Sequence, residues 1–97
     1  MTEARANGYL AECFWPGVAE SDLSELDMRI AAATADLAPT GKSARYLGSI
    51  LMCDDEVVLC LFEGSEAEVR ATAEQAGVPF ERILATAHSP WPAAARP

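Results

Sequence analysis

The sequence predicts one α+β domain in which four β-strands and two helices follow one another in the order β-α-β-β-α-β. Three observations predict it. Two segments place apolar residues three or four positions apart, which is the period of an amphipathic helix. Four shorter segments are rich in apolar and β-branched residues and end at turn-forming residues, as strands do. The chain has 97 residues, which is enough for one domain and too few for two.

The first strand and the first helix are expected between residues 9 and 38. Residues 9–14 have strand composition, and the Trp-Pro-Gly sequence at 15–17 breaks the strand. Ser21 or Ser24 can cap the helix that follows, and Pro39 ends it. The apolar positions of this helix are Leu23, Leu26, Ile30, Ala33 and Leu37.

A β-hairpin and the second helix are expected next. Residues 45–52 and 56–63 resemble strands, and the Asp-Asp pair at 54–55 suits a tight turn between them. The Ser-Glu-Ala-Glu sequence at 65–68 is a capping box, and the helix it begins is ended by Gly77.

Residues 80–88 supply the last strand. The resulting order is that of ferredoxin-like domains, in which two helices cover one face of a four-stranded antiparallel sheet. The folded domain is therefore expected to span 9–88, with an N-terminal extension over 1–8 and a Pro- and Ala-rich tail over 89–97.

The charge balance excludes several classes of partner. Seven basic residues against fifteen acidic ones give a net charge of −8, which repels nucleic-acid phosphates and anionic lipids. The longest apolar run, 57–62, is far shorter than the roughly 18 residues of a membrane span, and residues 1–7 have no apolar signal core. We therefore expect a cytoplasmic protein that binds neither nucleic acid nor membrane. Three cysteines without a C-x-x-C spacing indicate reduced thiols.

The hairpin is apolar on both of its faces. A two-residue turn at 54–55 gives one face the cross-strand pairs Leu51–Val58, Ser49–Cys60 and Leu47–Phe62, with Arg45 beyond them. We expect the helices to leave this face bare. A small domain with a bare apolar sheet needs a second cover, which another copy of the chain supplies most simply. The sequence therefore predicts a homodimer of the α+β barrel type.

The opposite face of the hairpin carries Ile50 and Leu59, and places Tyr46 across from Glu63. A phenol beside a carboxylate can act as a proton donor. The same pair can equally well satisfy a phenol at the margin of the sheet.

Four polar residues are the candidates for chemistry. Glu12 lies in the middle of the first strand, where a carboxylate is either a general base or is paired with Arg45 or solvent. Arg45 and Ser49 can orient a carbonyl or enolate oxygen beside the Cys60 thiol, or can form an ion pair and ordinary packing contacts. His88 is the single histidine and is either a proton shuttle, a metal ligand or a surface residue.

Several stretches of the chain resemble a family of small bacterial proteins of unassigned function. They are Tyr9-Leu10-Ala11-Glu12, Arg45-Tyr46-Leu47, Cys60-Leu61-Phe62-Glu63 and Ala76-Gly77-Val78-Pro79-Phe80. The spacing between Ser49, Asp54 and Cys60 is also similar. The resemblance implies a ferredoxin-like fold and a homodimer. The family that the chain resembles includes a nickel-binding protein.

These observations lead to two functional hypotheses and a third, simpler one. In the first, the homodimer encloses a small organic molecule and acts without a cofactor as a cyclase, dehydratase or isomerase. Glu12 or His88 moves the proton, and Arg45 and Ser49 hold the oxygen. The substrate-binding residues are Tyr46, Leu47, Leu51, Val58, Cys60 and Phe62. In the second, the homodimer binds nickel without catalysis, through His88, Glu12 and Cys60. In the third, the chain is an interaction module without a pocket.

Overall fold

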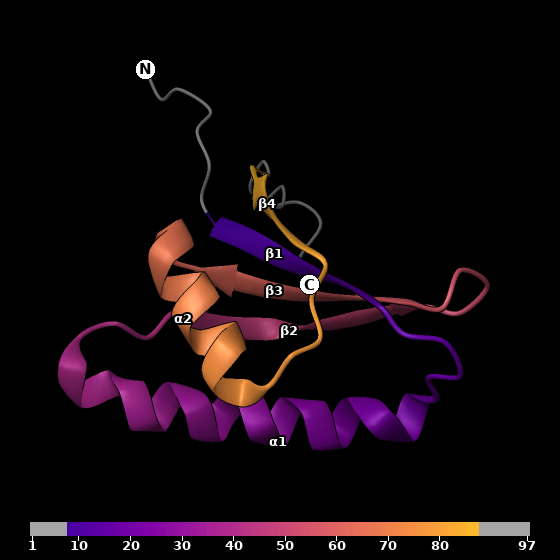
Figure 1. Cartoon of the computed structure of the whole chain (residues 1–97), viewed down its shortest axis with the longest axis horizontal. Helices are drawn as coiled ribbons and strands as arrows, with labels where there is room; N and C mark the ends of the chain where they lie inside the picture. The colour runs from indigo at the N-terminus through magenta and orange to yellow at the C-terminus, as the bar shows by residue number, and fades with distance from the viewer. Residues whose placement is uncertain (1–7, 88–97) are drawn as a thin grey trace, which may run out of the picture.

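The structure is a computed structural model that describes residues 8–87. Four strands form one antiparallel sheet, and two helices pack on the same face of it (Figure 1). The elements are β1 (Gly8–Phe14), α1 (Glu20–Leu37), the short 3₁₀ helix η1 (Ala38–Thr40), β2 (Arg45–Met52), β3 (Val57–Glu63), α2 (Glu66–Ala76) and β4 (Arg82–Thr86). The strand order across the sheet is β2-β3-β1-β4. The predicted ferredoxin-like α+β fold is confirmed.

The two helices begin at differently built caps. At α2 the Ser65 hydroxyl accepts a hydrogen bond from the Glu68 N–H at 3.1 Å, and the Glu68 carboxylate accepts one from the Ser65 N–H at 2.9 Å. This is the predicted capping box. Helix α1 instead begins at Glu20, where the Asp22 carboxylate accepts from the Ala19 N–H at 2.8 Å. The expected caps at Ser21 and Ser24 therefore lie inside the first turns of the helix.

The β2–β3 hairpin keeps the predicted pairing near its turn and departs from it farther away. Leu51 pairs with Val58 and Ser49 with Cys60, as expected. Leu47 forms a bulge, and Gly48 beside it has a φ of 136°, a conformation that favours glycine. The register beyond the bulge shifts by one residue. The predicted Leu47–Phe62 and Tyr46–Glu63 pairs are therefore wrong.

Beyond the bulge, Tyr46 pairs with Phe62 and Arg45 pairs with Glu63. The shift moves the Tyr46 side chain to the helix side of the sheet, since neighbouring residues of a strand point to opposite faces. Its ring lies 5.2 Å from that of Phe62, centroid to centroid.

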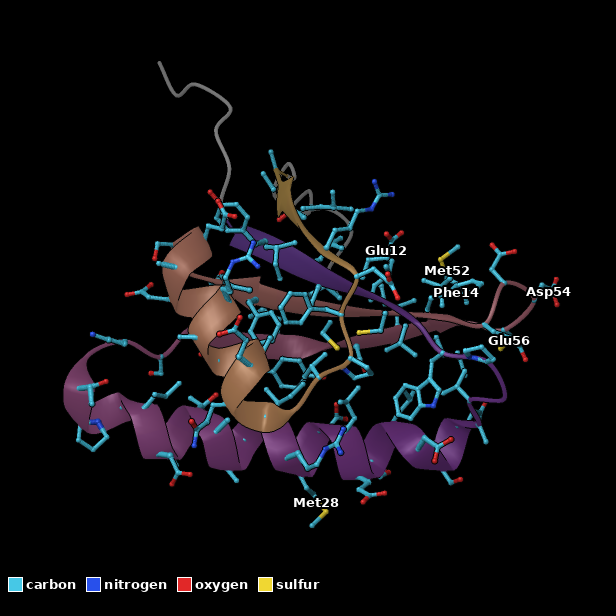
Figure 2. The ribbon with its side chains drawn as sticks, in the orientation of Figure 1. Glu12, Phe14, Met28, Met52, Asp54 and Glu56 are labelled. Carbon is cyan, nitrogen blue, oxygen red and sulfur yellow. The ribbon has the colours of Figure 1, made fainter. Side chains whose placement is uncertain are left out.

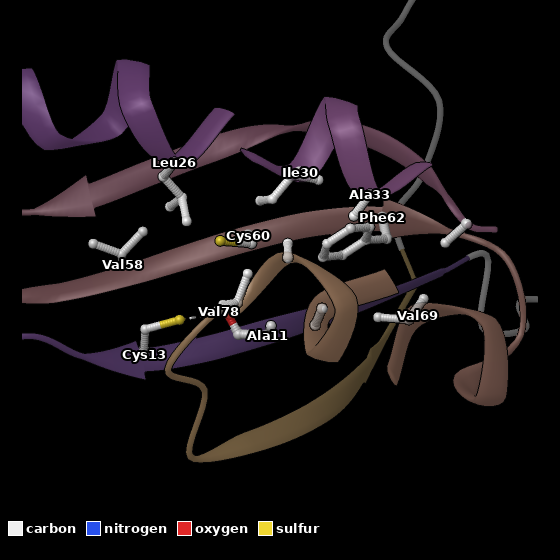
Figure 3. Close-up of a cluster of buried hydrophobic side chains, with 13 residues drawn as sticks. Ala11, Cys13, Leu26, Ile30, Ala33, Val58, Cys60, Phe62, Val69 and Val78 are labelled. Atoms are coloured by element: carbon white, nitrogen blue, oxygen red, sulfur yellow. Dashed lines mark hydrogen bonds between the residues drawn. The ribbon is translucent and has the colours of Figure 1, made fainter. Parts of the chain in front are cut away.

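The core lies between the helices and one face of the sheet. Figure 3 shows Leu26 and Ile30 of α1 beside Val58, Cys60 and Phe62 of β3. All five side chains are buried. The expectation that Val58, Cys60 and Phe62 line a bare face is therefore wrong. The hairpin alone could not decide between its faces because both are apolar.

Candidate functional site at the open face of the sheet

The sheet face away from the helices is apolar and uncovered by other elements of residues 8–87. We call it the open face, and its apolar side chains are Leu10, Phe14, Ile50, Met52, Val57, Leu59, Leu61 and Leu84. They alternate with the buried core residues of the same strands. Phe14 is 60% exposed and Ile50 is 49% exposed. Figure 2 shows Phe14, Met52 and Glu12 on the side of the sheet away from α1.

Within residues 8–87, two ion pairs lie on this face: Glu12–Arg82 stands among the apolar side chains, and Glu63–Arg45 stands where β2 begins. The Arg82 Nε donates to Glu12 Oε1 at 2.5 Å. The Glu12 side chain is 28% exposed, whereas that of Arg82 is 63% exposed. The hydrogen bond and the charge of Glu12 raise the pKa of Arg82 above its usual value. Strand pairing places Glu12 opposite Arg82 on one side and Leu59 on the other.

The predicted carboxylate is thus on the open face, and its partner is Arg82. Arg45, the expected partner, lies at the other end of the sheet, where its Nη1 donates to Glu63 Oε1 at 3.2 Å. In the register Arg45 pairs with Glu63 of β3, while Glu12 pairs with Leu59, four residues along the same strand. One chain therefore does not bring Glu12 and Arg45 together.

A hollow lies at the end of the open face next to the β2–β3 turn. It is lined by Glu12, Phe14, Asp54, Asp55, Val57 and Glu81. We call it the acidic hollow, because four of its six residues are carboxylates. The backbone N–H of Glu81 donates to the Glu12 carbonyl at 2.7 Å, which fixes the start of β4 against β1. The acidic hollow therefore offers carboxylates that can accept protons and hydrogen bonds, beside the apolar side chains of Phe14 and Val57.

The other predicted binding residues lie on the helix side of the sheet. The Tyr46 hydroxyl donates to Asp27 Oδ1 of α1 at 2.5 Å, and the Ser49 hydroxyl donates to the same oxygen at 3.4 Å. Burial and the hydrogen bond to Asp27 raise the pKa of Tyr46. Leu51 packs against the core and Leu47 is exposed at the bulge. Tyr46 and Ser49 therefore join β2 to α1 and do not face Glu12.

The Cys60 thiol is buried beside the Cys13 thiol of the neighbouring strand, and neither residue is exposed. Hydrogen bonding with Cys13 and burial raise the pKa of Cys60, so its thiolate is disfavoured. Cys60 and Glu12 lie on opposite faces of the sheet and cannot bind one metal ion within one chain. No three His, Cys, Asp or Glu side chains in residues 8–87 are placed to hold a metal ion. His88 lies outside the described residues.

Two contacts of the candidate residues were missed by the sequence analysis. Arg82 contacts Glu12 across the β1–β4 pair, and Asp27 accepts the Tyr46 hydroxyl. Both contacts join residues far apart in the chain. The alternation of side chains along β1 was one sequence signal for the site, because it places Glu12 on the same face as Leu10 and Phe14.

The fold and the site together define a ferredoxin-like α+β domain with an open, mainly apolar sheet face, on which the Glu12–Arg82 pair lies beside the acidic hollow. None of the helices within residues 8–87 has both the length and the apolar character needed to cross a bilayer. Comparison with protein-family models gave no match, and neither did searches of curated proteins and of solved structures. The relation to the nickel-binding family stays an expectation from the sequence.

Proposed function

We propose that the chain acts as a homodimer that binds a small organic molecule between two open faces and transfers a proton through Glu12, without a cofactor. The observation that carries this proposal is the Glu12–Arg82 pair, whose carboxylate has Leu10, Phe14 and Leu59 as its neighbours on the open face. A carboxylate among large apolar side chains is expensive unless it is paired or used. The reactions that suit it are cyclisation, dehydration and isomerisation.

The apolar area supports a second copy as the cover. Small soluble domains seldom leave a contiguous apolar sheet face in contact with water. A two-fold related copy offers the same apolar surface and therefore matches it automatically. Sheets that pack face to face stand about 10 Å apart. The acidic hollow beside Glu12 is the place we assign to the small molecule.

The chemistry follows from the two charged groups. Glu12 can take a proton from a carbon next to a carbonyl group, because its carboxylate lies on the open face, where a substrate can reach it. Arg82 keeps donors beyond the one bound to Glu12, since a guanidinium has five N–H groups. These donors can stabilise the negative charge that develops on the carbonyl oxygen. Arg82 thus takes the part that the sequence analysis gave to Arg45 and Ser49.

The nickel-binding alternative has less support from the described residues. Glu12 and Cys60 lie on opposite faces, so an ion bound by Glu12 would need its remaining ligands from other residues or from the second copy.

The proposal is tested by mass and by binding. We expect the protein to have the mass of a dimer at micromolar concentration and to raise the fluorescence of Nile red, a neutral apolar dye. The proton-transfer step is tested with 2-tetralone in D₂O, by NMR detection of exchange at the carbon next to its carbonyl. Glu12→Gln should lower the exchange rate at least tenfold, whereas Glu74→Gln on α2 should not. A monomer, or equal rates for both variants, would count against the proposal.

A further inference from the structure

The open face is electrically asymmetric along β2. Lys42 and Arg45 stand at the start of this strand, and Asp54, Asp55 and Glu56 follow its end. All five side chains are exposed. The strand has eight residues, which corresponds to about 26 Å in extended form. One end of the open face therefore carries two cations, of which Arg45 is paired with Glu63, and the other end is the acidic hollow. We call the first the cationic end.

This asymmetry distinguishes the ways in which two copies can stack. A two-fold axis parallel to the strands places equivalent ends over each other, so the four carboxylates of one acidic hollow face those of the other. A two-fold axis that runs across the strands reverses the ends. It places β2 over the partner's β2, with the cationic start of one strand over the acidic end of the other. Like charges held close together across an interface oppose association, whereas opposite charges favour it.

We propose that the homodimer has the reversed arrangement, and that Arg45 of each copy binds the partner's Asp54 and Asp55. This inference rests on the dimer of the proposed function and adds its orientation. The Arg45 side chain is 76% exposed, and Glu63 uses one of its donors. A guanidinium has five N–H donors, so others remain for a second carboxylate. The partner then supplies a cation beside Asp54 and Asp55 of the acidic hollow, in addition to the Arg82 that pairs with Glu12 within one chain.

The size of the sheet supports a role for contacts at its ends. Four strands about 4.8 Å apart and seven residues long project an area of roughly 400 Å². Each partner of a standard interface buries about 800 Å². Side chains that stand above the sheet and the residues beyond the strand ends must therefore supply the rest. Arg45, Asp54 and Asp55 are placed there.

Two reactive side chains of the chain make this arrangement testable by crosslinking. Lys42, at the cationic end, is the single lysine, and Cys53, at the acidic end, is the single exposed cysteine. They flank β2 and are too far apart within one chain for a short linker. In the reversed dimer they come close across the two-fold axis. We would treat the unmodified protein with a short crosslinker that joins an amine to a thiol, and identify the products by peptide mass spectrometry.

The expected product is a chain of doubled mass in which the Lys42 peptide is joined to the Cys53 peptide. Lys42→Arg and Cys53→Ser each remove one reactive group and should abolish it, while the dimer mass is unchanged. A dimer that gives no such product overturns the orientation and leaves the proposed function standing. A Cys53-to-Cys53 product with a bismaleimide would also overturn it, because it brings the acidic ends together. A monomer overturns both.

Charge reversal gives a second, independent measurement. Arg45→Glu should raise the dimer dissociation constant about tenfold or more, because it places a carboxylate against the carboxylates of the partner's Asp54 and the partner's Asp55. Adding Asp54→Arg and Asp55→Arg to the same chain should return the constant to within about threefold of the original value. If the triple variant is as weak as the single one, Arg45 does not face these carboxylates.

Discussion

The two faces of the sheet are both apolar, yet they differ in the size and exposure of their side chains. On the helix side β1 presents Ala11 and Cys13, which are fully buried. On the open face the same strand presents Leu10, Glu12 and Phe14, and Phe14 is largely exposed. Small residues let the helices approach closely, whereas large apolar residues on the other side have nothing above them in the described chain. One face of the sheet thus contributes to folding, whereas the other is the face that the proposed dimer would cover.

The largest effect should come from the helix side. Phe62 is 1% exposed and packs against Tyr46, so Phe62→Ala should remove about 3 to 5 kcal/mol of unfolding free energy, measured by urea denaturation. Phe14→Ala on the open face is the matched control, measured at a dilution where the chain is monomeric. It should cost much less, because Phe14 is 60% exposed in one chain. Equal losses would mean that the two faces do not differ in this way.

The next effect should appear in association and leave folding intact. Ile50 lies on the open face opposite Leu59, and Ile50→Glu would place a charge in the centre of the proposed interface. We expect the dimer dissociation constant to rise at least 100-fold, which corresponds to about 2.7 kcal/mol. Circular dichroism should show an unchanged helix and strand content.

The control for this variant is Met28→Glu. Met28 is 71% exposed on the outer side of α1, away from the sheet (Figure 2). A similar fall in affinity for both variants would show that a general increase in negative charge, and not the open face, controls association.

A smaller effect is expected where β2 is braced against α1. Tyr46→Phe removes the hydrogen bond to Asp27, and we expect a loss of about 1 to 3 kcal/mol at neutral pH. The loss should also depend on pH. The folded chain holds the pKa of Tyr46 above the usual 10, so above pH 10 the unfolded chain gives up this proton while the folded chain keeps it.

Stability contributed by this shift is therefore complete below pH 10 and decreases as the pH rises beyond it. Tyr46→Phe should weaken the decrease in unfolding free energy between pH 9 and 11. Tyr9→Phe alters the other tyrosine and serves as the control. If the two variants have the same alkaline profile, the Tyr46 phenol does not carry this dependence.

The sequence was sufficient for the fold and insufficient for the choice between the faces. Helix α2 has both of its local signals, the Ser65 capping box and Gly77, which has a φ of 71°, and it was predicted correctly. The hairpin register near the turn also follows from local pairing. The bulge at Leu47 does not, because it depends on a glycine conformation that the residue permits but does not require. The choice of face depends on where distant helices pack.

The same reasoning explains the partial prediction of the site. A carboxylate in a strand must reach solvent or a partner, which placed Glu12 on the open face. Its partner depends on the pairing of β1 with β4, two strands separated by most of the chain. Arg45 was chosen because it is near Ser49 and Cys60 in the hairpin pattern. The bulge moves it to the opposite face from those residues.

The smallest effect on stability is expected at the Glu12–Arg82 pair, where the effect on the rate of proton exchange should be large. Arg82→Gln should shift the thermal midpoint by no more than a few degrees, since exposed ion pairs contribute little to folding. Arg70→Gln is the control, because Arg70 forms an ion pair with Glu66 on α2, away from the open face, and both of its side chains are partly exposed. Both variants should unfold similarly. Only Arg82→Gln should slow 2-tetralone exchange, because it removes the donors that stabilise the negative charge developing on the carbonyl oxygen. If exchange falls for both or for neither, Arg82 has only a structural contact with Glu12. The open face is then an interface without a catalytic pair.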